Sequence, residues 1–171
     1  MIGRGNQDPV PGFSLALNRC ICTRYRRRMQ VHRWISVNAS PGDVFAYLHD
    51  PQARARWDRM SDLVRLEADA PAKGVRVHFR GRRTAPSWVG EFAAYDPPRR
   101  SVIRLVEGVG MPFTEFTETI TVKAEGRGSR IDMTIEYTPR GLLRLLDGFT
   151  SRPRLSKAAD RSLRAVADHF L

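Results

Sequence analysis

The sequence predicts an α+β domain in which a strongly curved antiparallel sheet of seven strands wraps around a long C-terminal helix. A strand is followed at once by two short helices within 31–59, and six alternating runs separated by turns fill 62–138. A broad apolar stripe with helical period follows Pro139. A sheet of this size needs one face covered, and this helix is the only predicted element long enough to cover it. We therefore expect one domain over residues 30–171.

The first strand and the two short helices follow from local signals. Apolar and polar residues alternate over 31–38, which is typical of a strand. Ser40 is a natural N-cap and Pro41 suits the first position of a helix, so a helix of two to three turns should follow. Pro51 ends that helix, and a second short helix continues to about residue 59.

The middle of the chain has the pattern of an antiparallel meander, because each boundary between alternating runs contains the Gly or Pro that a chain reversal requires. The predicted strands are 62–68, 74–83, 87–95, 101–107, 113–124 and 129–138. After them, the C-terminal helix contains Gly148 and Pro153, which can kink or split it.

The charge is concentrated near the N-terminus. The 171 residues carry a net charge of +11, and residues 1–30 contain six arginines against one acidic residue. Residues 1–29 show no sustained period, so we expect a disordered basic extension there. We hypothesise that translation begins at Met29, and a tethering arm for acidic partners is the functional alternative. Because the rest of the chain mixes both charges, we expect no DNA binding and keep RNA or an acidic protein as an alternative partner.

Several functional classes are not supported by the sequence. Cys20 and Cys22 form a lone C-x-C pair, which we interpret as reduced thiols. The four histidines have no metal-ligand spacing, and no nucleophile elbow, P-loop or dinucleotide-binding turn occurs, so we expect no metal and no cofactor. No apolar run reaches the length of a membrane helix, and the apolar piece near the N-terminus precedes its arginines, the reverse of a secretory signal. We expect a cytoplasmic protein that is not integral to a membrane.

Two motifs resemble those of a known superfamily. One is Val37-x-Ala39-Ser40-Pro41-x-x-Val44-Phe45-x-x-Leu48-x-Asp50, completed by Trp57, and the other is Gly128-Ser129-Arg130-Ile131 leading to Tyr137. Residues 31–171 thereby resemble the helix-grip fold of the SRPBCC superfamily, which includes START lipid-transfer domains and bacterial polyketide cyclase/dehydrase-like proteins. The resemblance implies a deep apolar cavity between the sheet and the long helix that holds lipids, polyketides or other hydrophobic small molecules.

Strand alternation predicts which side chains face that cavity. Trp88 and Tyr137 would add polar tips that orient a ligand, although most inward residues of a domain simply pack in its core. The strand candidates are Val77, Phe79, Trp88, Phe92, Phe116, Glu118, Ile120, Met133, Ile135 and Tyr137, and the helix candidates are Leu142, Leu146 and Phe149.

Glu118 is the one carboxylate on the inward stripe of its predicted strand, so it would need Arg80, Arg104 or a ligand donor as its partner. A one-residue slip in register would place it in solvent instead. Our first hypothesis is therefore binding of a hydrophobic small molecule. The second is a polyketide cyclase or dehydratase in which Glu118 or Tyr137 moves protons and Arg80 stabilises an enolate. The third is an interaction protein for RNA or an acidic partner.

Overall fold

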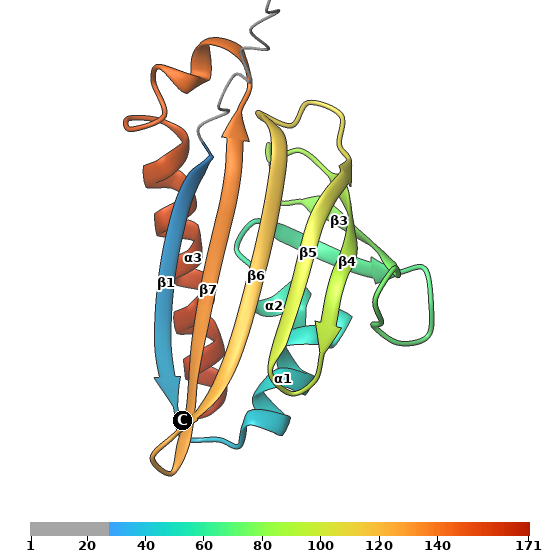
Figure 1. Cartoon of the computed structure of the whole chain (residues 1–171), viewed down its shortest axis with the longest axis vertical. Helices are drawn as coiled ribbons and strands as arrows, with labels where there is room; N and C mark the ends of the chain where they lie inside the picture. Colours follow the sequence, from blue (N-terminus) through green and yellow to red (C-terminus); the bar gives the residue numbers. More distant parts are fainter. Residues whose placement is uncertain (1–27) are drawn as a thin grey trace, which may run out of the picture.

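Seven antiparallel strands form one curved sheet whose concave side holds the helices (Figure 1). The computed structural model describes residues 28–171, except for the side chain of Arg144. The predictions for Cys20, Cys22 and most of the basic extension lie outside the described residues. The predicted fold class is confirmed.

The elements follow one another in the predicted order. Their bounds are β1 Met29–Val37, α1 Pro41–His49, α2 Pro51–Trp57, β2 Ser61–Leu66, β3 Arg76–Gly81, β4 Trp88–Asp96, β5 Arg100–Glu107, β6 Phe113–Glu125, β7 Gly128–Pro139, η1 Gly141–Arg144 (a 3₁₀ helix) and α3 Ser151–His169. The strand order in the sheet is β1-β7-β6-β5-β4-β3-β2. Strands β2 to β7 thus form a continuous meander in which each strand pairs with the next, and β7 also pairs with β1.

Side-chain caps define the two short helices. Ser40 Oγ accepts a hydrogen bond from the backbone N–H of Asp43 at 3.2 Å at the start of α1. Asp50 both ends α1 and caps α2, because its carboxylate accepts from the N–H of Ala53 at 2.6 Å. The prolines that follow each cap occupy the first helical position, where a missing N–H costs nothing.

The two sequence motifs meet in space. Val37 pairs with Ser129 across β1 and β7, and Ser129 Oγ donates to the carbonyl oxygen of Ala39 at 2.7 Å. A Cβ atom at Gly128 would lie 2.1 Å from the carbonyl oxygen of Val37, so only glycine permits this approach. The contact fastens the start of α1 to the turn between β6 and β7.

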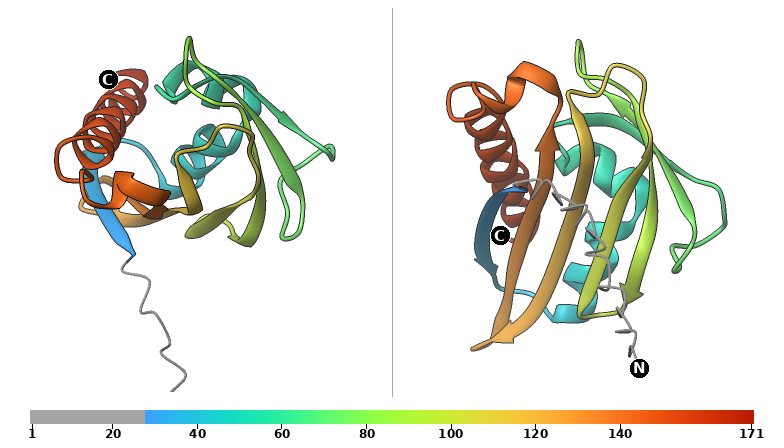
Figure 2. Two further views of the ribbon diagram at one scale, coloured as in Figure 1. Left: turned by 90° about the horizontal axis from the view of Figure 1, so that it is seen from above. Right: turned by 45° about the horizontal axis from the view of Figure 1, so that its top comes forward.

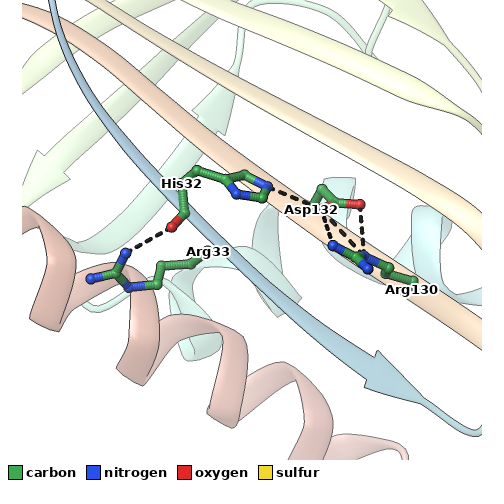
Figure 3. A network of polar contacts seen from close by, with 4 residues as sticks. All are labelled: His32, Arg33, Arg130 and Asp132. Carbon is green, nitrogen blue, oxygen red and sulfur yellow. Dashed lines mark hydrogen bonds and ion pairs between the residues drawn. The ribbon is translucent and has the colours of Figure 1, made fainter.

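A polar network crosses the outer face of the same strand pair (Figure 3). His32 Nε2 lies 3.0 Å from Asp132 Oδ1, and Arg130 Nη2 donates to the same oxygen at 3.1 Å. Partial burial alone would raise the pKa of Asp132, but the hydrogen bonds from Arg130 and His32 outweigh it and lower that pKa. The network ties β1 to β7 on the side away from the helices.

The helices divide the concave face between them. Helix α3 packs mainly on β1, while α2 packs on β2 and α1 on β6 (Figure 2). The buried side of α3 recurs every three to four residues through Leu155, Ala159, Leu163 and Val166. Among residues 28–171, no helix combines the length and apolar character that a bilayer-spanning segment requires.

The start of the C-terminal helix differs from the prediction. Leu142, Leu146 and Phe149 lie before α3, and they are 79%, 52% and 89% exposed, so the expectation that they face the interior is wrong. Gly141 has a φ of +54°, so the chain turns sharply after β7. Residues Gly141–Arg144 then form a 3₁₀ helix in place of an α-helix. Pro153 lies in the first turn of α3, where proline is tolerated.

Replacement of Gly128 by alanine should test the motif contact. We expect Gly128→Ala to lower the free energy of unfolding by about 2 kcal/mol or more, because the new methyl group meets backbone that cannot move without disrupting the β1–β7 pairing. Urea denaturation measures the change. Gly148→Ala is the matched control, since an added Cβ there meets no atom within 4 Å. Equal stability of the two variants would contradict the contact.

Candidate ligand-binding site

The predicted inward stripe of the sheet is confirmed by burial. The ten strand candidates are all between 0% and 8% exposed: Val77, Phe79, Trp88, Phe92, Phe116, Glu118, Ile120, Met133, Ile135 and Tyr137. The register of β6 against β7 places Glu118 opposite Ile135 and Phe116 opposite Tyr137. The slip that would have moved Glu118 into solvent therefore does not occur.

Aromatic rings form a continuous wall on this inner face. Phe79 of β3 stacks on Trp88 of β4 with ring centroids 4.2 Å apart, and Trp88 meets the edge of Phe116 on β6 at 5.3 Å. Phe113 and Tyr137 extend the wall, with centroids 5.0 Å apart. Such offset and edge contacts are the favourable arrangements of aromatic pairs.

A buried ion pair stands against this wall. Arg54 Nη2 of α2 donates to Glu118 Oε1 of β6 at 2.5 Å, and both side chains are only 3% exposed. The guanidinium carbon of Arg54 lies 4.9 Å from the ring centroid of Phe79 and 5.1 Å from that of Trp57. Paired with a carboxylate and resting on two rings, the arginine is stabilised in an interior that would otherwise exclude it.

The partner of Glu118 is not one of the two arginines that the sequence suggested. Arg80 pairs with Asp62 at 2.7 Å and Arg104 pairs with Glu91 at 2.8 Å, and both arginine side chains are largely exposed on the convex face. Strand alternation explains this, because Arg80 follows the inward Phe79 by one residue. The expected role of Arg80 beside a substrate in the interior is therefore wrong.

Arg54 is the functional residue that sequence reasoning missed. The cap at Asp50 sets the start of α2, and positions three and four residues apart then share the buried side, which places Arg54 together with Ala53 and Trp57. One sequence signal could have indicated Arg54: it lies one helical turn before Trp57, so both side chains share one side of α2. A partner 64 residues away in the sequence gives no local signal.

Several polar atoms around the ion pair have no protein partner. Arg54 Nε and Nη1 and Trp57 Nε1 are buried N–H donors without an acceptor in the described part of the chain. Asp58, also 3% exposed, lies at the end of α2, where burial raises its pKa, the charge of Arg54 opposes that shift, and the charge of Glu118 adds to it. The site thus offers donors to a molecule that brings an acceptor group.

Tyr137 is occupied by a different contact. Its hydroxyl donates to Asp147 Oδ2 at 2.9 Å, and both residues are buried. Burial raises the pKa of Tyr137, and the hydrogen bond to the Asp147 carboxylate raises it further. The bond holds the segment before α3 against the end of the sheet, so Tyr137 supports structure here.

His49 forms a second buried polar pair, at the C-terminal end of α1. Its Nδ1–H donates to the carbonyl oxygen of Phe45 at 2.8 Å, which leaves Nε2 to accept from Ser101 Oγ at 2.7 Å. Burial lowers the pKa of His49 to about 4, although the bond to Phe45 partly opposes this. The imidazole is neutral at physiological pH and links α1 to β5.

Metal ligands do not cluster in the described residues. Within 28–171 no group of three or more His, Cys, Asp or Glu side chains is placed to hold an ion. His32 and His78 each face one carboxylate on the surface, that of Asp132 and that of Glu67.

An open groove of about 700 Å³ lies along β2, β3 and β4. Most of its lining comes from the convex face: Leu63, Arg65, His78, Arg80, Val89 and Glu107, next to Phe79 and Trp88. The hydrogen-bonded pairing of β3 with β4 separates this groove from the ion pair, which lies on the concave face.

This arrangement favours binding over proton transfer. The carboxylate of Glu118 already accepts from Arg54, and the hydroxyl of Tyr137 already donates to Asp147. The donors of Arg54 and Trp57 lack a partner within residues 28–171. An apolar body packed on rings and a polar head facing a few converging donors is the usual form of a small-molecule site.

Comparison with known proteins agrees with this geometry. A family model described as polyketide cyclase / dehydrase and lipid transport matches residues 28–170. No curated protein is similar enough in sequence to count as a relative.

Solved structures share the fold at low identity. The crystal structure of Ara h 8.0201 superposes with a TM-score of 0.65 at 10% identity, over 84% of this chain and 97% of that one. Ginseng major latex-like protein 151 from Panax ginseng gives 0.64 at 15% identity, over 84% and 98%. TTHA0849 from Thermus thermophilus gives 0.62 at 19% identity, over 83% and 98%. At these identities the likeness shows the fold alone.

The ion pair predicts a strong asymmetry between single and double substitution. Arg54→Met leaves Glu118 buried without its partner and should lower the free energy of unfolding by about 3–5 kcal/mol, whereas Arg54→Met/Glu118→Met should regain most of that loss. Arg104→Met, which breaks an exposed pair, serves as the control and should cost at most about 1 kcal/mol. Urea denaturation of the four proteins measures this. A single variant no weaker than the control would rule out a buried pair.

His49 predicts a loss of stability in mild acid. The unfolded chain binds the proton near pH 6.5 and the folded chain only near pH 4, so this contribution is complete above pH 6.5 and declines as the pH falls toward 4. The full difference corresponds to about 3 kcal/mol. Free energies of unfolding between pH 7.5 and pH 5, measured on the wild type and on His49→Gln, should show a shallower decline in the variant. Parallel curves would mean that His49 is not the titrating group.

Proposed function

The chain belongs to the polyketide cyclase / dehydrase and lipid transport family, and on that premise we propose that it binds a hydrophobic small molecule that carries a hydrogen-bond acceptor. The apolar body, lipid-like or polyketide-like, packs along the inner face of the sheet. The acceptor, a carboxylate or a carbonyl oxygen, faces Arg54. The proposal includes the cavity between sheet and C-terminal helix that the family resemblance implies.

One observation carries this proposal: Arg54 is buried among aromatic rings and keeps two N–H donors without a protein acceptor. An unpaired buried donor costs stability, typically about 1–3 kcal/mol. Such a cost is compensated when a ligand supplies the acceptor. A pocket that contains only hydrocarbon would select ligands by shape, whereas this one also selects for an acceptor at one place.

An enzyme of the cyclase or dehydratase type using the same interior is a less supported alternative. Its candidate proton carriers, Glu118 and Tyr137, are both engaged by protein groups. Catalysis by Glu118 would require a substrate to displace Arg54 from the carboxylate, whereas binding alone requires no such displacement. We therefore favour a carrier or receptor role.

A second candidate function, docking of RNA or an acidic protein, is favoured by one surface. Arginines from three places converge on an open hollow of about 570 Å³: Arg59 after α2, Arg82 and Arg83 after β3, and Arg161 on α3. Asp62 is the one acidic side chain in that lining. Binding at this surface would weaken steeply with ionic strength, unlike binding of a neutral lipid in the interior.

Matched ligands test the proposed function directly. A long-chain fatty acid at a hundred times its dissociation constant should raise the free energy of unfolding by about 2.7 kcal/mol, and its methyl ester should bind at least about tenfold more weakly, because the ester carries no charge for Arg54 to pair. Thermal unfolding with each ligand measures both effects. Aromatic polyketides belong in the same panel.

The double variant Arg54→Met/Glu118→Met separates the site from general hydrophobicity. It should lose the preference for acid over ester while still binding the apolar body, and Arg104→Met should keep the wild-type preference. Native mass spectrometry of the purified protein then identifies any molecule carried from the cell. If no ligand of a broad panel stabilises the protein, the proposal fails.

A further inference from the structure

Four large apolar side chains stand exposed on one short segment between β7 and α3. Leu142, Leu145, Leu146 and Phe149 are 79%, 81%, 52% and 89% exposed. Soluble domains normally scatter such residues singly, and a cluster marks an interaction surface. We call residues 141–150 the apolar lobe.

The lobe holds a defined shape. The buried carboxylate of Asp147 accepts from Tyr137 at 2.9 Å, and the backbone N–H of Arg152 donates to the Asp147 carbonyl oxygen at 3.1 Å. Within the lobe, Thr150 Oγ1 donates to the carbonyl oxygen of Leu146 at 2.9 Å. These hydrogen bonds hold the segment in place, while Leu142, Leu145, Leu146 and Phe149 stay exposed.

Arginines flank the lobe in the sequence, and no exposed acidic residue lies between positions 139 and 159. Arg140 precedes it, Arg152 and Arg154 follow it, all three are exposed, and none pairs with a carboxylate in the described residues. Asp147 is the only acidic residue from 139 to 159, and it is buried. The first turn of α3 carries two arginines and no acid, the reverse of the charge that stabilises a helix N-terminus.

The lobe projects from one end of the molecule. Figure 1 shows η1 and the following turn beyond the end of β7, at the same end as the loop between β5 and β6. The two are tied together, since the N–H of Arg140 donates to the carbonyl oxygen of Pro112 at 2.8 Å. That loop adds Val109, which is 94% exposed. The lobe and this loop therefore lie side by side at one end of the molecule (Figure 1).

We propose that this end of the protein docks on the surface of an anionic lipid bilayer, with the apolar lobe inserted among the lipids and Arg140, Arg152 and Arg154 against the headgroups. Exposed apolar side chains that project from one end of the molecule can insert into a bilayer, and the exposed arginines next to them add attraction to anionic headgroups. An acidic protein would match the arginines but leave the leucines and Phe149 without a hydrocarbon partner. The docking does not depend on a ligand in the interior.

Co-sedimentation of the full chain with lipid vesicles tests this proposal. The wild type should bind vesicles of phosphatidylcholine mixed with phosphatidylglycerol, bind pure phosphatidylcholine vesicles at least about tenfold more weakly, and lose binding as salt rises. Leu145→Ser/Phe149→Ser should weaken binding to the mixed vesicles at least about tenfold. Arg152→Gln/Arg154→Gln should weaken it several-fold and reduce the salt dependence.

Matched controls lie at the opposite end of the molecule (Figure 1). Lys123→Gln/Arg127→Gln removes two exposed charges near the turn between β6 and β7, and Leu171→Ser removes the exposed leucine at the C-terminus. Both should bind mixed vesicles like the wild type. All four variants change exposed side chains and should keep the wild-type Tm, which confirms that they fold.

Three results would overturn the docking proposal. They are absence of wild-type binding to the mixed vesicles, wild-type binding by the lobe variants, and a change in oligomeric state of the lobe variants without a change in vesicle binding, which would make the lobe a contact between copies of the chain. Stabilisation by fatty acid, measured on the same lobe variants in the absence of vesicles, keeps the two proposals separate. A protein that binds fatty acid but no vesicle retains the proposed function and loses the docking.

Discussion

The ion pair between Arg54 and Glu118 joins a short helix to the centre of the sheet, and the interior is organised around it. Taking two charges out of water is expensive, so the pair persists only if helix and strand hold it in good geometry. This requirement limits how α2 can lie on the sheet. With α2 in place, Trp57 packs beneath it and Asp58 is buried beside the pair. The position of α2 on the sheet therefore depends on this ion pair as well as on apolar packing.

Two groups of helices cover the concave face of the sheet. Helices α1 and α2 cover the half that contains the ion pair, and α3 covers the half next to β1 (Figure 2). The motif contact between Ser129 and Ala39 fastens the first group, and the bond between Tyr137 and Asp147 fastens the segment that leads to the second. The two groups also meet directly, because the backbone N–H of Arg59 after α2 donates to Ser162 Oγ of α3 at 3.0 Å.

The two proposals assign different chemistry to different parts of the molecule. The interior offers donors among rings, which suits a hydrophobic molecule with one acceptor group. The end that contains the apolar lobe offers the reverse arrangement, with hydrocarbon outside and the polar group of Asp147 inside. The description of the family includes lipid transport, and both proposals are consistent with that description.

The sequence by itself determined the fold class, the order of the elements and the inward face of each strand, because capping, turn chemistry and two-residue alternation are local properties. Glu118 was placed correctly on that face. Its partner Arg54 was not found, since the contact joins residues 64 apart and depends on how α2 lies on the sheet. The exposure of Leu142, Leu146 and Phe149 also required the tertiary structure. Their apolar pattern is the same whether a helix begins at residue 141 or at 151, and the structure places the start at 151 through the positive φ of Gly141 and the bond from Tyr137 to Asp147.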